Sequence, residues 1–360
     1  MFLVDAHLDL AMNALEWNRD LRQPVASIRA RESGLADRPD RGRGTVSLPE
    51  MRRAGVGLVV ATQIARYVAP DNPLPGWHSA EQAWAQTQGQ LAWYREMEKA
   101  GEMVAITDLA SLDAHLAIWQ APPENAPIGY VRSLEGADSL VSVDYLERAV
   151  RDGLRAVGPA HYGPGRYAPG THTTGPLEAN GPALLAAMER LGVILDVTHL
   201  SDDSLWQALD LFGGAVWASH HNARVLVPDQ RQLPDDQIRA VIARGGVIGA
   251  SCDAWMIVPG WVRGTSTPRS TGCTCERLAD HVVHVCSLAG STRHVCIGSD
   301  LDGAFGTEQT PQEIDTIADL HRLCDVLAAR GFTDDDLEGF RWRNVVALLR
   351  AHWTDRTWIA

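Results

Sequence analysis

Short apolar segments rich in Val, Ile and Ala recur along the whole chain, and most of them precede a stretch with helical periodicity. Strands that are apolar at nearly every position are typical of parallel sheets covered on both faces, and alternation with helices places them in β/α units. Eight such segments predict an α/β fold, the (β/α)8 TIM barrel. They span residues 2–7, 56–64, 128–135, 154–161, 193–199, 215–220, 247–251 and 295–300.

A ninth and weaker segment, 103–107, is predicted as an accessory strand within the insertion between the second and third barrel strands. No linker or change of composition divides the chain, so we expect residues 1–360 to form a single barrel domain. Three long connections, at about 18–45, 162–177 and 256–274, follow strand ends. Because barrel enzymes keep their sites on that face, these connections are candidate lids or subunit contacts, and a solvated surface insertion is the alternative for each.

Composition and charge argue against some classes of binding partner. The chain has 360 residues, 32 basic and 45 acidic, and a formal net charge of −13. Binding to nucleic acid or to an anionic membrane rests on a basic surface, so we expect neither partner. The N-terminal segment lacks a basic n-region, no window approaches the ~20 apolar residues of a membrane span, and the six cysteines lack zinc-ribbon spacing. These features together predict a cytoplasmic protein with reduced cysteines.

Imidazole and carboxylate side chains stand at the ends of six predicted strands. The carboxyl ends of parallel barrel strands meet at one mouth, so these side chains are expected to lie together. Neutral nitrogen and hard oxygen ligands suit zinc or a similar divalent ion. Each residue by itself could instead be a hydrogen-bonded core histidine or a helix N-cap, but the ordered series favours a metal site. The residues are His7, Asp9, Glu135, His161, His199, His220 and Asp300.

The number of candidate ligands favours two metal ions over one, because it exceeds the three protein ligands of a mononuclear catalytic site. A carboxylate can bridge two cations at a separation of ~3.5–4 Å. Many barrel hydrolases use a carboxylated lysine as the bridge. The one lysine here, Lys99, lies at the charged end of a predicted helix, so Glu135 is the expected bridge.

Five motifs resemble the membrane (renal) dipeptidase family of zinc amidohydrolases, and the resemblance to this family, as a bacterial-type member, covers nearly the whole chain. The motifs are Asp-Ala-His-Leu-Asp-Leu at 5–10, Ser-Leu-Glu-Gly at 133–136, Leu-Asp-Val-Thr-His-Leu-Ser at 195–201, Ala-Ser-His-His-Asn-Ala-Arg at 218–224 and Ile-Gly-Ser-Asp-Leu-Asp-Gly at 297–303.

The resemblance implies two Zn²⁺ ions per chain, which other divalent ions could replace. His7 and Asp9 would bind one ion, His199 and His220 the other, and Glu135 both. The implied reaction is the hydrolysis of the amide bond of a dipeptide by a hydroxide that bridges the metals. The family tolerates a D-residue on the C-terminal side, and family members suggest a homodimer.

The resemblance also implies roles for three further residues. His161 would stabilise the oxyanion of the tetrahedral intermediate, and Asp300 would bind the substrate amine and transfer the proton. Arg231 would pair with the substrate carboxylate, for which a guanidinium offers a planar fork.

The segments expected around the substrate depart from the family pattern. Leu8 replaces the usual Asn, 162–167 lacks the usual Thr- and Asn-rich run, and 251–255 lacks an Asn and a Tyr. A hydrolase of another small amide, such as an N-acyl amino acid or a lactam, is therefore the alternative function, and a non-catalytic metal-binding barrel is a remote one. Arg166 and His172, in the loop after His161, are open candidates for substrate contact.

Overall fold

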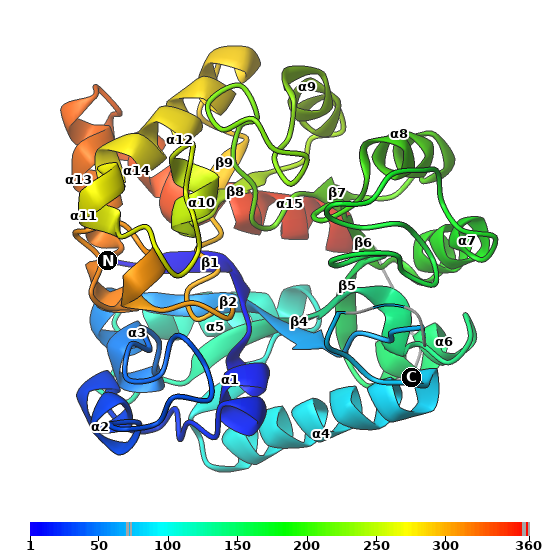
Figure 1. Ribbon diagram of the computed structural model, residues 1–360, viewed down its shortest axis with the longest axis horizontal. Helices are drawn as coiled ribbons and strands as arrows, with labels where there is room; N and C mark the ends of the chain where they lie inside the picture. The colour runs from blue at the N-terminus through cyan, green and yellow to red at the C-terminus, as the bar shows by residue number, and fades with distance from the viewer. Residues whose placement is uncertain (70–71, 73, 355–357, 359–360) are drawn as a thin grey trace.

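The computed structural model describes residues 1–69, 72, 74–354 and 358, and its central feature is a ring of parallel strands surrounded by helices (Figure 1). Eight strands follow the order β7-β6-β5-β4-β2-β1-β9-β8, and a bridge between Ala218 and Ile248 joins the two ends of this order. The predicted (β/α)8 barrel is therefore confirmed. The strands are β1 (Leu3–Leu8), β2 (Val56–Ile64), β4 (Ile128–Glu135), β5 (Leu154–Gly158), β6 (Ile194–Asp196), β7 (Val216–Trp217), β8 (Ile248–Ala250) and β9 (Val295–Ile297).

The accessory strand predicted at 103–107 is also present, as β3 (Met103–Ala105). It pairs with the N-terminal half of β4, where Met103 lies opposite Ile128. On β4, pairing with β5 begins only at Arg132. Strand β3 thus occupies part of the β4 edge that the shorter β5 leaves uncovered, and it stands outside the ring of eight.

Four barrel strands end well before the position that the sequence predicted. β5, β6, β7 and β9 each end three residues before the polar residue that was expected to finish the strand. His199 has φ 71° and Asp300 has φ 57°, a left-handed conformation that cannot continue a strand. The Asp196 carboxylate accepts backbone hydrogen bonds from Thr198 and Ser219, so a side chain replaces strand pairing at this level. The four candidate residues His161, His199, His220 and Asp300 therefore lie in the first turns beyond their strands, whereas His7 and Glu135 lie within β1 and β4.

Helices surround the barrel, and the longest, α4, runs along the lower side of Figure 1. None of the described helices is long and apolar enough to cross a membrane. The helices are α1 (Leu10–Glu16), α2 (Val25–Arg31), α3 (Leu48–Ala54), α4 (Ala80–Lys99), α5 (Leu109–Trp119), α6 (Tyr145–Arg151), α7 (Gly181–Leu191), α8 (Asp202–Leu211), α9 (Asp235–Ala243), α10 (Ala254–Ile257), α11 (Pro268–Thr271), α12 (Cys275–Ala289), α13 (His321–Ala329), α14 (Asp334–Glu338) and α15 (Asn344–Trp353), with a π-helical turn at Gly339–Arg343.

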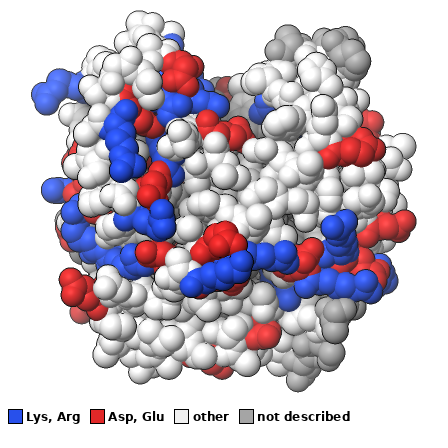
Figure 2. All heavy atoms as spheres, turned by 90° about the horizontal axis from the view of Figure 1, so that it is seen from below, with Lys and Arg blue, Asp and Glu red and all other residues white. Residues whose placement is uncertain are grey.

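Charged side chains of both signs are interspersed on the face seen from below (Figure 2). Ion pairs at α4 join Arg95 to Asp152 at 2.7 Å and Lys99 to Glu96 at 2.5 Å. The Lys99 side chain is 72% exposed at the end of this outer helix. Lys99 therefore lies outside the barrel, away from the carboxyl ends of the strands.

The first long connection, 18–45, is tied to the barrel mouth by a buried ionic network. The Arg19 guanidinium contacts carboxylate oxygens of Glu32 at 2.8 Å, Asp40 at 2.9 Å and Asp302 at 3.3 Å. Asp302 follows β9, and its Oδ1 also accepts hydrogen bonds from the backbone N–H and the hydroxyl of Thr45. Because Arg19 and its three partners are all buried, this connection is fixed to the segment that carries Asp300.

Helix α8, which follows β6, is N-capped by the side chain of Ser201. The Ser201 hydroxyl accepts a hydrogen bond from the Ser204 N–H at 3.2 Å and donates to the Gly175 carbonyl at 2.6 Å. We expect Ser201→Ala to lower the free energy of unfolding by about 1 kcal/mol, measured by urea denaturation. Thr267→Ala, at the cap of the exposed four-residue helix α11, is the control and should cost less. Equal stabilities of Ser201→Ala and the wild-type protein would contradict this prediction.

Candidate metal centre

The structure brings the candidate residues of six strand ends to one mouth of the barrel, around one carboxylate oxygen. Glu135 Oε1 lies 3.0 Å from Nε2 of His199, 3.4 Å from that of His220, 3.6 Å from that of His7 and 3.9 Å from that of His161. Glu135 ends β4, whereas the histidines come from four other strand ends. A single carboxylate is thus surrounded by four imidazole nitrogens.

The two aspartates of the candidate set lie at the edge of this group. Asp9 Oδ2 is 3.9 Å and Asp300 Oδ1 is 3.8 Å from His7 Nε2. Among the described residues, ligand atoms form three groups whose members all lie within 4.8 Å of one another, and two of these groups share Glu135. The groups are His7, Asp9 and Glu135; Glu135, His199 and His220; and His7, His220 and Asp300.

Neighbouring hydroxyl groups orient the candidate ligands. Thr171 Oγ1 lies 2.8 Å from His199 Nδ1, and Ser219 Oγ lies 2.9 Å from His220 Nδ1. The Thr62 hydroxyl, on β2, donates a hydrogen bond to Asp9. A hydrogen bond at one ring nitrogen fixes the orientation of a histidine and leaves the other nitrogen for a metal. Both histidines accordingly direct Nε2 toward Glu135.

Burial keeps the candidate imidazole ligands neutral. Burial and, to a smaller extent, the positive charge of Arg231 together lower the pKa of His7 to about 3. Burial also lowers the pKa values of His199 and His220 well below the usual range, with Arg231 and neighbouring histidines adding to the effect. A neutral imidazole is the form that binds a metal ion.

Burial and mutual repulsion disfavour the charged form of the carboxylates at this site. Burial raises the pKa of Asp9 to about 6. It raises the pKa values of Glu135 and Asp300 well above the usual range, and the charges of neighbouring carboxylates add to this. His7 Nε2 is buried and has no hydrogen-bond partner among the described residues. Crowded carboxylates beside an unpartnered ring nitrogen fit a divalent cation, which would stabilise the charge and accept the nitrogen lone pair.

A cavity of about 330 Å³ opens onto this centre, and its lining includes residues that the sequence interpretation did not name as candidates. Arg66 follows β2 and Asp253 follows β8, so the strand-end rule that identified the histidines could have found both. Tyr162 and Arg263 also line the cavity from the loops after β5 and β8, and Met256 lines it from the short helix α10. No local pattern in the sequence distinguishes these three from their neighbours.

Arg231 lies in the wall of the same cavity and is buried. Its Nη2 donates to the His220 carbonyl at 3.0 Å, and its Nη1 lies 3.4 Å from the His221 ring. Its Nε is buried and has no hydrogen-bond partner among the described residues. His221 packs on Arg231 instead of lining the cavity, as expected for a residue that faces away from its neighbour His220.

The two open candidates in the loop after His161 do not line this cavity. Arg166 donates hydrogen bonds to the carbonyls of Asp138, Leu140 and Val141, so its guanidinium holds the loop in place. The His172 side chain is 56% exposed and lies 3.4 Å from Asp229.

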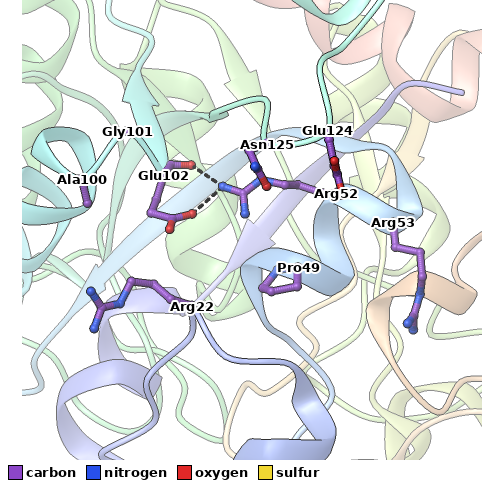
Figure 3. Close-up of a pocket in the computed structure, with 9 residues that line it drawn as sticks. All are labelled: Arg22, Pro49, Arg52, Arg53, Ala100, Gly101, Glu102, Glu124 and Asn125. Atoms are coloured by element: carbon purple, nitrogen blue, oxygen red, sulfur yellow. Dashed lines mark hydrogen bonds and ion pairs between the residues drawn. The ribbon is translucent and has the colours of Figure 1, made fainter.

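A larger cavity, of about 680 Å³, lies beside the N-terminal ends of β2, β3 and β4 (Figure 3). Arg22, Arg52 and Arg53 line it together with Glu102. Arg52 points toward Glu102 and pairs with its carboxylate at 2.6 Å, as Figure 3 shows. It also donates to the carbonyl of Ala126 at 2.9 Å. The N-terminal end of a barrel typically serves stability, and the candidate ligands lie at the other end.

A parallel barrel with imidazoles and carboxylates gathered beyond the carboxyl ends of its strands is the arrangement typical of barrel metallohydrolases. The sequence model of the membrane dipeptidase family, peptidase family M19, matches residues 1–356. The chain belongs to this family, and the resemblance predicted from its motifs is confirmed. The family is one of metal-dependent peptidases.

Individual relatives agree with this family. A Klebsiella pneumoniae protein encoded in the pqqA 5′ region is 31% identical over 50% of this chain and 63% of its own length. The dipeptidase tcpJ of Claviceps purpurea is 29% identical over 62% of this chain and 51% of its own length. The chain thus spans about half the length of the curated relatives it matches. A Rhodobacter sphaeroides metallopeptidase, solved with a phosphinate mimic of the dipeptide L-Ala-D-Ala, superposes with a TM-score of 0.78 at 23% identity, covering 98% of this chain and 99% of that one. At 23% identity, this superposition shows only that the two proteins share a fold.

Proposed function

We propose that this chain is a dinuclear zinc dipeptidase. The observation that carries the proposal is the position of Glu135 Oε1, which lies within 3.9 Å of four imidazole Nε2 atoms. In this proposal His7 and Asp9 would hold one Zn²⁺, His199 and His220 would hold the other, and Glu135 would bind both. The neutral histidines and the crowded carboxylates of the site support this ligand set.

Zinc ions bound there would lower the pKa of water at the site to roughly 7 and polarise the amide carbonyl. Side chains of the protein would bind the substrate, transfer the proton and stabilise the oxyanion. Arg231, in the cavity wall, would bind the substrate carboxylate, and its unpartnered Nε supports this role. Asp300 would take up the proton and pass it to the leaving amine, and His161 would stabilise the oxyanion.

The substrate we propose is a dipeptide, with a D-residue accepted on the C-terminal side. The L-Ala-D-Ala mimic bound by the Rhodobacter sphaeroides protein supports this choice. The cavity of about 330 Å³ is at the small end of the range of ligand sites, which suits a dipeptide better than a longer peptide.

Steady-state assays of the zinc-loaded protein on L,L- and L,D-dipeptides test this function. We expect turnover of both classes, and a fall of at least about tenfold in kcat/KM when the C-terminal carboxylate is replaced by an amide, because Arg231 then loses its charged partner. N-acyl amino acids and lactams complete the panel. Preferred turnover of N-acyl amino acids or lactams would favour the alternative hydrolase. No turnover at full zinc occupancy would remove the proposal.

The single-domain organisation, the cytoplasmic location and the homodimer stay predictions of the sequence.

A further inference from the structure

Arg66 makes a contact at the candidate site that none of the roles above explains. The residue follows β2 and lies between two cavities, the one at the candidate metal centre and an adjoining one of about 400 Å³. Its Nη2 lies 2.8 Å from His161 Nδ1, and its Nη1 donates to the Pro75 carbonyl at 3.1 Å. Arg66 Nε is buried and has no hydrogen-bond partner among the described residues.

The chemistry of the two side chains decides the direction of this hydrogen bond. A guanidinium carries N–H donors and no acceptor, so Arg66 must donate and His161 Nδ1 must accept. A neutral imidazole has one N–H, which is then on Nε2. His161 Nε2 is the ring nitrogen that faces the centre, 3.9 Å from Glu135 Oε1. The contact therefore places a hydrogen-bond donor at the barrel mouth.

The surroundings of His161 favour the same state of the ring. Nδ1 already accepts the hydrogen bond from the Arg66 guanidinium. A proton on Nδ1 would also place an N–H directly against the Arg66 guanidinium. The cationic ring and the Nδ1–H tautomer are both disfavoured by this geometry.

Burying part of the Arg66 guanidinium costs free energy, and no ion pair among the described residues compensates for this cost. Its side chain is half-buried, and both of its described hydrogen-bond acceptors, a ring nitrogen and a carbonyl, are neutral. Burial lowers the pKa of Arg66, and the charges of Asp138 and Glu135 offset this only in part, since neither carboxylate forms an ion pair with the guanidinium. Arg66 is thus poorly explained as a stabilising ion pair and better explained by its effect on His161.

We propose that Arg66 is a positioning residue that fixes His161 as the neutral Nε2–H tautomer, so that His161 acts as a hydrogen-bond donor to the carbonyl oxygen of the substrate. This inference rests on the proposed dipeptidase function and assigns His161 no part in proton transfer. The proton moves through Asp300 alone, because the one N–H of His161 stays on Nε2 throughout the reaction.

The tautomer of His161 is measured directly by ¹⁵N NMR of the zinc-loaded protein, with its signals assigned by their loss in His161→Gln. We expect a protonated Nε2 and an unprotonated Nδ1 in the wild-type protein. Arg66→Met removes the donor and should give a mixture of tautomers, whereas Arg66→Lys keeps a donor and should partly restore the Nε2–H form. Arg263→Met, which removes another guanidinium of the cavity wall that does not contact His161, is the matched control and should leave the tautomer unchanged.

Kinetics supply the second measurement. Arg66→Met is expected to lower kcat for a dipeptide by about 10- to 100-fold, since one oxyanion donor contributes on the order of 10²–10³. KM should change little, because Arg66 acts through His161, and Arg66→Lys should recover part of kcat. A proton on Nδ1 in the wild-type protein, or an unchanged kcat in Arg66→Met, would overturn the inference. Failure of the proposed function would show differently, as an inactive wild-type protein in which His161 is still the Nε2–H tautomer.

Discussion

Replacing Glu135 by glutamine is expected to lower kcat/KM for a cleavable dipeptide by at least about 10³-fold and to reduce the zinc content of the chain. Glu135 Oε1 is the atom that the surrounding imidazoles share, and the residue is 8% exposed at the end of β4. Glutamine keeps the shape of the side chain but removes the negative charge that would bridge two cations. Assays at saturating zinc and elemental analysis measure the two effects.

The control for this prediction is Glu96→Gln, which makes the same chemical change on the exposed face of α4. It should leave both activity and zinc content unchanged. We expect close to two zinc ions per wild-type chain and clearly fewer in Glu135→Gln. Chelation should abolish the activity of the wild-type protein, and added zinc should restore it. A Glu135→Gln protein that still holds two zinc ions would show that the assignment of the bridge is wrong.

Replacing Arg19 by methionine is expected to lower the free energy of unfolding by about 3–5 kcal/mol, since breaking a buried ion pair leaves its partner charges uncompensated. The guanidinium contacts the carboxylates of Glu32, Asp40 and Asp302, of which Glu32 has a second cationic partner in Arg41, and the Arg19 side chain is fully buried. Denaturation by urea at saturating zinc measures the change.

Arg22→Met is the matched control for Arg19. It lies three residues away in the same connection, but its side chain is 50% exposed and pairs with Asp20 at the surface. An exposed ion pair contributes about 0–1 kcal/mol, so this variant should unfold almost as the wild-type protein does. Equal stabilities of the Arg19 and Arg22 variants would show that the buried network does not fix the connection to the barrel mouth.

The barrel could be predicted from the sequence because its signal is local. A buried parallel strand is apolar at nearly every position, so segments such as 56–64 and 128–135 are visible without knowledge of their neighbours. The ends of the strands were predicted less accurately, because the left-handed turn at His199 depends on the residues packed around it. Strand β6 accordingly ends at Asp196, three residues before the predicted end.

The candidate ligands could be predicted for a related reason. In a barrel, position along a strand fixes which end a residue occupies, so a polar residue that follows a strand is already placed at the mouth. Glu135 and His7 were placed together in this way although they are far apart in the sequence. The same rule applies to Arg66, which follows β2, but a lone arginine after a strand carries no motif that sets it apart.

The sequence by itself therefore determined the barrel, the family and the candidate ligands at the mouth, since periodicity and strand-end position are properties of short segments. Only the tertiary structure decided how these side chains act on one another. The contacts of Arg66 with His161 and of Arg19 with Asp302 join residues that are separated by 95 and 283 positions. Such contacts depend on the paths of the loops between them, and those paths are set by packing and charge pairing in the folded molecule.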